Sequence, residues 1–190
     1  MPFNEVWYSE DGLTNLEGLC SVAKSLETGA VIEIGCWEGR SAVTIANALP
    51  DDILLTVDTW EGNGPEDSDH PTVQALKQRD VYSDFKSNMN EMTNGNYAVY
   101  KMDCHEFEKT WNDPIKFVHI DACHDYENVI QTIEALRPHM VEGGIMCGDD
   151  FANAHIRRKD LDGGVERAVR ESFKKFYHSG NLWYAQRGDK

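Results

Sequence analysis

The sequence predicts a doubly wound α/β fold, in which a mostly parallel sheet is covered by helices on both faces. Short apolar stretches alternate with segments whose apolar residues recur at the helical period, and this alternation is typical of parallel sheets. The stretch at 53–58 is apolar enough to be buried on both faces. The length of 190 residues suits one domain, 1–190, with a substantial core.

Each expected element follows from a local pattern. A leucine-rich stripe predicts the first helix, and Pro50 and Pro138 end two later ones. The segment 60–71 is rich in glycine, proline and acidic residues, which indicates a loop, and we expect 61–80 to form a lid or substrate insertion. The expected helices are 13–26, 41–49, one containing 81–92, 129–136 and 165–176, and the expected strands are 31–35, 53–58, 97–102, 115–121, 144–148 and 182–185.

The junction after the first strand is the most informative segment. The strand runs into a turn that contains Gly35 and Gly39, and a helix follows from Ser41. Such a strand, glycine turn and helix form nucleotide pockets in α/β sheets. Glycines lack the Cβ atoms that would keep a ligand from the backbone, and the first N–H groups of the helix are donors for an anionic group. The alternative is a tight strand–helix connection without a ligand.

Composition narrows the classes of partner. The net charge of −15, from 33 acidic and 18 basic residues, argues against nucleic acid, because phosphate binding needs a basic surface. The chain has no apolar run long enough for a membrane span and no signal-peptide pattern at its start. The five cysteines are dispersed and lack a Cys-x-x-Cys pair, which favours free thiols in a reducing compartment. We therefore expect a cytoplasmic protein.

Carboxylates follow the ends of four expected strands. They are Asp58, Asp103, Asp121, and the pair Asp149 and Asp150. Because parallel strands end at one edge of a sheet, these acids are expected to converge on one crevice, where like charges need protons, hydrogen bonds or a cation. Local alternatives are that Asp58 begins a turn, that Asp103 caps a helix starting near His105, and that Asp149 and Asp150 cap a following helical turn.

Five segments resemble class I S-adenosylmethionine (SAM)-dependent methyltransferases, and within them the group of macrocin O-methyltransferase and cephalosporin-hydroxylase-like enzymes. The segments are VIEIGCWEGRS at 31–41, TVDTW at 56–60, FVHIDACHDY at 117–126, LRPHMVEGGIMCGDDF at 136–151 and GVERAV at 164–169. The resemblance spans about residues 15 to 187 and implies a Rossmann-like, seven-stranded sheet. The family often forms homo-oligomers.

The resemblance implies a role for each matching residue. Asp58 would bind the ribose, with Thr59 and Trp60 beside it, while Asp103 and Cys104 would lie near the adenine. Asp121, which follows the fourth strand, would also border the cofactor. The first motif would surround the methionine moiety of SAM with Glu33, Gly35, Cys36, Trp37, Gly39 and Ser41. Trp37, Trp60 and Tyr126 are candidate pocket walls, and the alternative for each is core packing.

A metal site is expected beside the cofactor. Similar metal-dependent enzymes hold Mg²⁺ at positions that match Asp121, Asp149 and Asp150, and these carboxylates form the hard oxygen site that Mg²⁺ prefers. A bound metal would lower the pKa of an acceptor hydroxyl. Asp121 and His124 are the candidate catalytic residues, His124 as a general base or extra ligand, or only as a partner of the local turn.

The other histidines leave the base unassigned. His119 is expected to be structural and His139 to lie at the far end of the sheet, whereas His70 and His155 lie in candidate loops over the pocket. The predicted function is methyl transfer from SAM to a hydroxyl of a small molecule, such as a sugar or natural product. The alternatives are SAM binding without methyl transfer, and a nucleotide-dependent oxidoreductase, which the lack of a Gly-x-Gly-x-x-Gly motif disfavours.

Overall fold

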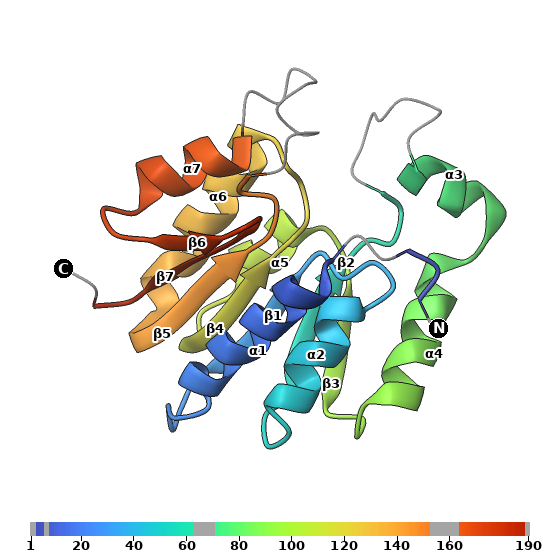
Figure 1. The fold of residues 1–190 in the computed structure, drawn as a ribbon, viewed down its shortest axis with the longest axis horizontal. Helices are drawn as coiled ribbons and strands as arrows, with labels where there is room; N and C mark the ends of the chain where they lie inside the picture. Colours follow the sequence, from blue (N-terminus) through green and yellow to red (C-terminus); the bar gives the residue numbers. More distant parts are fainter. Residues whose placement is uncertain (1–2, 6–7, 63–70, 153–163, 189–190) are drawn as a thin grey trace.

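The computed structural model describes residues 3–5, 8–62, 71–152 and 164–188, and Figure 1 shows its central sheet. The seven strands have the order β3-β2-β1-β4-β5-β7-β6. The strands are β1 (Ala30–Ile34), β2 (Leu54–Asp58), β3 (Tyr97–Lys101), β4 (Ile115–Ile120), β5 (Met140–Gly148), β6 (Tyr177–Ser179) and β7 (Leu182–Gln186). Neighbours from β3 to β5 are parallel, and β7 pairs antiparallel with β5 and β6. The predicted mostly parallel sheet is confirmed.

Helices cover both faces of the sheet, as predicted (Figure 1). They are α1 (Glu10–Ala23), α2 (Arg40–Ala48), α3 (Pro71–Gln78), α4 (Val81–Met92), α5 (Cys104–Thr110), α6 (Tyr126–Leu136), the 3-10 turn η1 (Arg137–His139) and α7 (Gly164–Ser172). Apolar residues of α1, α2 and α4 form the core on one face, and those of α5, α6 and α7 form the core on the other. No helix in the described ranges is long and apolar enough to cross a membrane.

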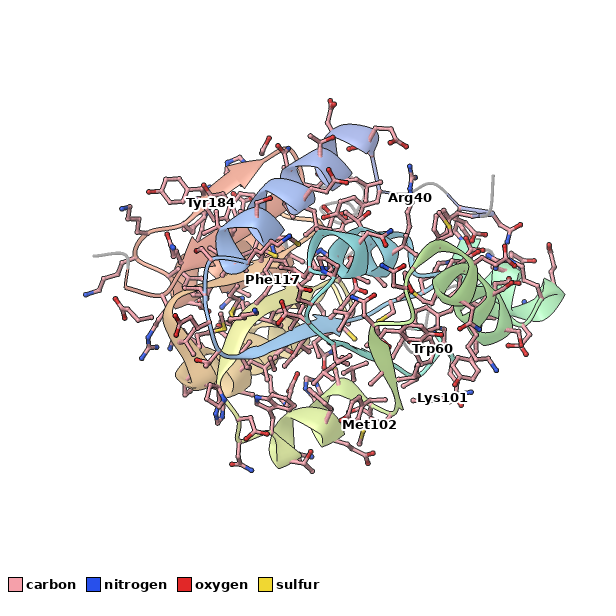
Figure 2. The ribbon with its side chains drawn as sticks, turned by 90° about the horizontal axis from the view of Figure 1, so that it is seen from below. Arg40, Trp60, Lys101, Met102, Phe117 and Tyr184 are labelled. Atoms are coloured by element: carbon pink, nitrogen blue, oxygen red, sulfur yellow. The ribbon has the colours of Figure 1, made fainter. Side chains whose placement is uncertain are left out.

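The central strands explain why the sequence folds in this way. All six residues of β4 are buried, so its side chains supply core on both faces. Figure 2 shows Phe117 of β4 in the middle of the molecule, and it belongs to the core on the α1 face. Ser9, Asp80 and Asp125 cap the starts of α1, α4 and α6 by accepting hydrogen bonds from backbone N–H groups. The helix-capping residues and the buried central strand therefore indicate the same arrangement of helices and strands.

Several elements differ from the sequence expectation. The strand β6 was not predicted, because its three residues are all exposed and carry no alternating pattern. The helix α3 was also not predicted, and it occupies most of the described part of the expected insertion 61–80. Residues 63–70 of that insertion lie outside the described residues. The helix α7 ends at Ser172 rather than at residue 176, and β5 begins at Met140, four residues before the expected start.

Candidate active site

The carboxyl ends of the parallel strands bring the first predicted motif next to the predicted acids. Backbone hydrogen bonds hold the turns together: Gly35 N–H donates to the carbonyl of Val57 at 2.9 Å, and Asp121 N–H donates to the carbonyl of Ile34 at 2.8 Å. Asp149 N–H donates to the carbonyl of Ile120 at 3.2 Å. The ends of β1, β2, β4 and β5 thus form one continuous edge, as sequence reasoning expected.

The two glycines of the turn are required by the protein itself. Gly35 has a φ of +85°, and a Cβ there would overlap the backbone carbonyl of Asp121. Gly39 has a φ of +86°, and its Cβ would lie 2.9 Å from the ring of Phe85. Both values lie in the left-handed region that glycine tolerates best. Protein atoms therefore explain both glycines by themselves, and the predicted approach of a ligand to this turn stays a prediction.

Asp58 joins the turn after β1 to the turn after β2. Its Oδ2 accepts hydrogen bonds from the N–H groups of Cys36, at 2.7 Å, and Trp37, at 2.9 Å. Its Oδ1 accepts one from Trp60 N–H at 2.7 Å. Thr59, between them, accepts a hydrogen bond from Glu61 N–H. A carboxylate has about four lone-pair positions, so Asp58 retains capacity for another donor, and its ribose role stays a prediction.

The candidate aromatic walls have different surroundings. Trp60 is only 4% exposed, and its ring packs on those of Tyr82 and Phe85. Its indole N–H donates to the Trp37 carbonyl at 2.8 Å, so Trp60 is a core residue that supports the turn. Figure 2 places it on the β3 side of the molecule, near Lys101. The ring of Tyr126 lies against the guanidinium of Arg167, and its hydroxyl donates to Glu171 at 2.6 Å.

A buried polar chain lies beneath the turn. Glu33 and His119 are neighbours across β1 and β4, and Glu33 Oε1 lies 3.1 Å from His119 Nδ1. His119 Nε2 lies 3.3 Å from the hydroxyl of Tyr8. No described group bonds Glu33 Oε2, although that atom is buried. His119 is structural in this arrangement, as expected, whereas Tyr8 was missed because its partner is 111 residues away in the sequence.

Four predicted cofactor residues, Asp103, Cys104, Ser41 and Cys36, have surroundings that the structure defines. Asp103 caps α5, accepting hydrogen bonds from His105 N–H at 2.9 Å and Glu106 N–H at 3.2 Å, which is the alternative that the sequence left open. Cys104 follows it, and burial raises its thiol pKa to about 12. Ser41 is buried in the first turn of α2. Cys36 is also buried, and its burial raises the pKa of its thiol. Neither thiol is an activated nucleophile.

An acidic cluster lies at the ends of β4 and β5. One ligand atom each from Asp121, His124 and Asp150 lies within 4.8 Å of the others. His124 Nε2 is 2.9 Å from Asp150 Oδ2 and 4.0 Å from Asp121 Oδ1. The structure thus brings two of the three predicted metal ligands together with His124. Asp149 is outside this group and lines a neighbouring cavity with Tyr8. Its role as a ligand stays a prediction.

Burial and repulsion between carboxylates perturb this cluster. Burial and the charges of Asp149 and Asp150 raise the pKa of Asp121 well above its ordinary value, with further contributions from Glu33 and Asp58. The pKa of Asp149 is raised to about 6, mainly by burial and to a lesser extent by the charge of Asp150. Acids in this state are stabilised by protons or by a cation. The cluster therefore has the donor set and the excess of negative charge that suit a hard divalent ion.

A charged network that the sequence did not indicate surrounds the outer side of the turn. Glu38 is 3% exposed, and its carboxylate accepts hydrogen bonds from Asn4 N–H and Nδ2, both at 2.8 Å, and from Glu5 N–H at 3.2 Å. Arg79, between α3 and α4, forms ion pairs with Glu38, Glu5 and Asp84. The indole N–H of Trp37 donates to Glu5 at 3.2 Å. These contacts connect residues 4 and 5, the turn and the end of the expected lid.

The geometry defines a class of fold: a doubly wound α/β domain with a glycine turn after β1 and acids at the ends of the neighbouring parallel strands. A family model described as a methyltransferase domain matches residues 32–151, and the chain belongs to this family. It is a class I SAM-dependent methyltransferase. This match favours SAM over the nicotinamide cofactor of the oxidoreductase alternative.

Solved structures share the fold at low sequence identity. An O-methyltransferase from Bacillus cereus in complex with SAH is 16% identical, with a TM-score of 0.64 over 95% of this chain and 80% of that chain. The O-methyltransferase NovP is 19% identical, with a TM-score of 0.65 over 92% and 78%. CalS11, a TDP-rhamnose 3'-O-methyltransferase, is 17% identical, with a TM-score of 0.62 over 96% and 82%. No curated protein sequence matches the chain.

Proposed function

We propose that this methyltransferase acts on a hydroxyl group of a small molecule and that a divalent cation such as Mg²⁺ assists it. The observation that carries the proposal is the cluster of Asp121, His124 and Asp150 at the strand ends beside the cofactor turn. The three structural neighbours described above are O-methyltransferases, which supports a hydroxyl acceptor. The motif resemblance favours the macrocin-like group and a sugar or natural-product acceptor.

The residues present fit both groups that this reaction needs. Asp121 and Asp150 would hold the cation with His124, because their carboxylates repel one another in its absence. The turn after β1, Glu33 and Asp58 would hold SAM, since Glu33 Oε2 is a buried acceptor that no described group bonds. When bound, SAM supplies an activated methyl group and the cation supplies Lewis acidity.

The protein's own residues would hold the cofactor turn in place and provide a group that faces the acceptor. Asp58 fixes the turn that carries the cofactor by bonding its backbone N–H groups. His124 Nε2 faces both carboxylates of the cluster, so it serves either as a ligand or as the base that takes the hydroxyl proton. The alignment of acceptor and donor, together with the exclusion of water, supplies much of the rate enhancement in such displacements.

The test is methyl transfer from tritiated SAM to a panel of hydroxyl compounds, with metal removed by EDTA and then restored. We expect product that depends on Mg²⁺ and falls by about 100-fold in Asp150→Asn. Asp113→Asn, an exposed acid before β4, is the matched control and should retain full activity. SAH binding without any methylated product would contradict the proposal and favour the binding-only alternative. Full activity after metal removal would exclude the role of the cation.

A further inference from the structure

A cavity of about 360 Å³ opens beside the acidic cluster, outside the cofactor turn. One wall is the start of α1 and the other is the turn between β6 and β7, with Asp149 between them. The lining residues are Tyr8, Ser9, Asp11, Gly12, Asn15, Asp149, Ser179, Gly180, Asn181 and Leu182. This volume is at the lower end of the range of about 300–1,000 Å³ for small-molecule sites.

The cavity is connected to the expected site of reaction. Asp149 lines it and is adjacent in sequence to Asp150, and its charge is among those that raise the pKa of Asp121. Tyr8 forms part of the wall, and its hydroxyl lies 3.3 Å from His119 Nε2 in the chain that leads to Glu33. A molecule in this cavity would therefore lie between α1 and the acids that end β4 and β5.

The lining has a definite chemical character. The lining residues include the amides Asn15 and Asn181 and the hydroxyl residues Ser9 and Ser179. Asn15 Nδ2 donates to Ser179 Oγ at 3.2 Å and so joins the two walls, whereas Ser9 Oγ accepts a hydrogen bond from Gly12 N–H at 3.0 Å. The charged groups among the described lining residues are the carboxylates of Asp11 and Asp149, without a lysine or arginine. Amides and hydroxyls bind polyols, whereas carboxylates attract amines and repel anions.

We propose that this cavity is the acceptor site and that it takes a neutral or amine-bearing polyhydroxylated molecule rather than one that carries a phosphate or a free carboxylate group. The inference rests on the proposed function and specifies its substrate class. The sequence between β5 and α7 contains Arg157, Arg158 and Lys159, which lie outside the described residues. Their charge is opposite to that of Asp11 and Asp149, so the experiment compares acceptors of different charge.

The first experiment measures binding with three matched probes in the presence of SAH: methyl α-D-glucopyranoside, D-glucosamine and glucose 6-phosphate. Amide resonances of the isotope-labelled protein report the position of each probe. We expect the neutral and amine probes to shift Asn15, Ser179 and Asn181, and the phosphate to bind at least about tenfold more weakly. Equal or tighter binding of the phosphate would overturn the charge assignment, and a lack of shifts at these residues with every probe would overturn the site.

Variants separate this inference from the proposed function. Asn15→Leu should weaken binding of the neutral probe by about fivefold, since it removes an amide from the wall, and should leave the SAH dissociation constant unchanged. Thr14→Leu, on the neighbouring exposed position of α1, should change neither. Unchanged probe affinity in Asn15→Leu would refute the assigned wall. If the wild-type protein does not bind SAH, the proposed function is refuted, whether or not the probes bind.

Discussion

Replacing Arg79 by glutamine tests whether the charged network stabilises the cofactor turn. Glutamine removes the ion pairs to Glu5, Glu38 and Asp84, and Glu38 is only 3% exposed. Removing one partner of a buried pair costs about 3–5 kcal/mol. Glu38 keeps three hydrogen bonds from Asn4 and Glu5, and the side chains of Arg79 and Asp84 are 20% and 34% exposed, so solvent screens part of the loss.

We therefore expect Arg79→Gln to lower the free energy of unfolding by about 2–3 kcal/mol, which corresponds to about 5–10 °C in Tm for a chain of this size. Because Glu38 adjoins Trp37, whose N–H bonds Asp58, we also expect SAH affinity to fall by about tenfold. Urea unfolding measures the first effect and calorimetric titration of SAH measures the second.

The control is Arg170→Gln, which removes a surface pair with Glu166 and the contacts of its guanidinium with the rings of Phe151 and Phe176, and should lower stability by no more than about 1 kcal/mol. Adding Glu38→Gln to Arg79→Gln should restore part of the lost stability, because the unpaired buried charge is then absent. An Arg79→Gln protein with wild-type unfolding free energy and wild-type SAH affinity would refute the reasoning.

Three further predictions follow from the site. The folded-state pKa of Asp149 is raised to about 6, and that of Asp121 is raised well above its ordinary value. Because both acids bind protons more tightly in the folded state, their contribution to stability should be largest below about pH 4 and should be lost as the pH rises to about 6 and beyond. For Asp149 the effect is at most about 3 kcal/mol, and Asp149→Asn should flatten this part of the pH profile of urea unfolding; an unchanged profile would contradict it. Gly35→Ala should destabilise by more than about 3 kcal/mol, whereas Gly95→Ala, also at positive φ but in open space, should cost only about 1 kcal/mol, and equal thermal shifts would be the contrary result. Asp103→Ala should cost about 1 kcal/mol through the lost cap of α5; if calorimetry gives unchanged SAM affinity, capping is its whole role.

The sheet was predictable because its central strands are buried on both faces. Every residue of β4 is buried, and such an apolar run between helical segments has few other interpretations. The exposed strand β6 gave no such signal, since it depends on pairing with β7 through a turn at Gly180. The helix α3 follows an acidic segment and contributes few buried residues, so its periodicity was weak.

The candidate site was predictable to the extent that it depends on strand ends. The positions of Asp58, Asp121 and Asp150 follow from the rule that parallel strands end at one edge. The grouping of Asp150 with His124 rather than with Asp149 depends on the backbone of Asp150, whose φ of +65° has no sequence signal. Arg79 and Glu5 are 74 residues apart, and nothing local to either residue indicates the contact.

The most direct test of the account is a crystal structure with SAH and Mn²⁺, in which anomalous scattering locates the metal. We predict a manganese peak within coordination distance of the carboxylates of Asp121 and Asp150, with SAH against the turn at residues 35–39 and its sulfur facing the metal. A manganese position away from both aspartates, or SAH bound elsewhere on the sheet, would contradict the account.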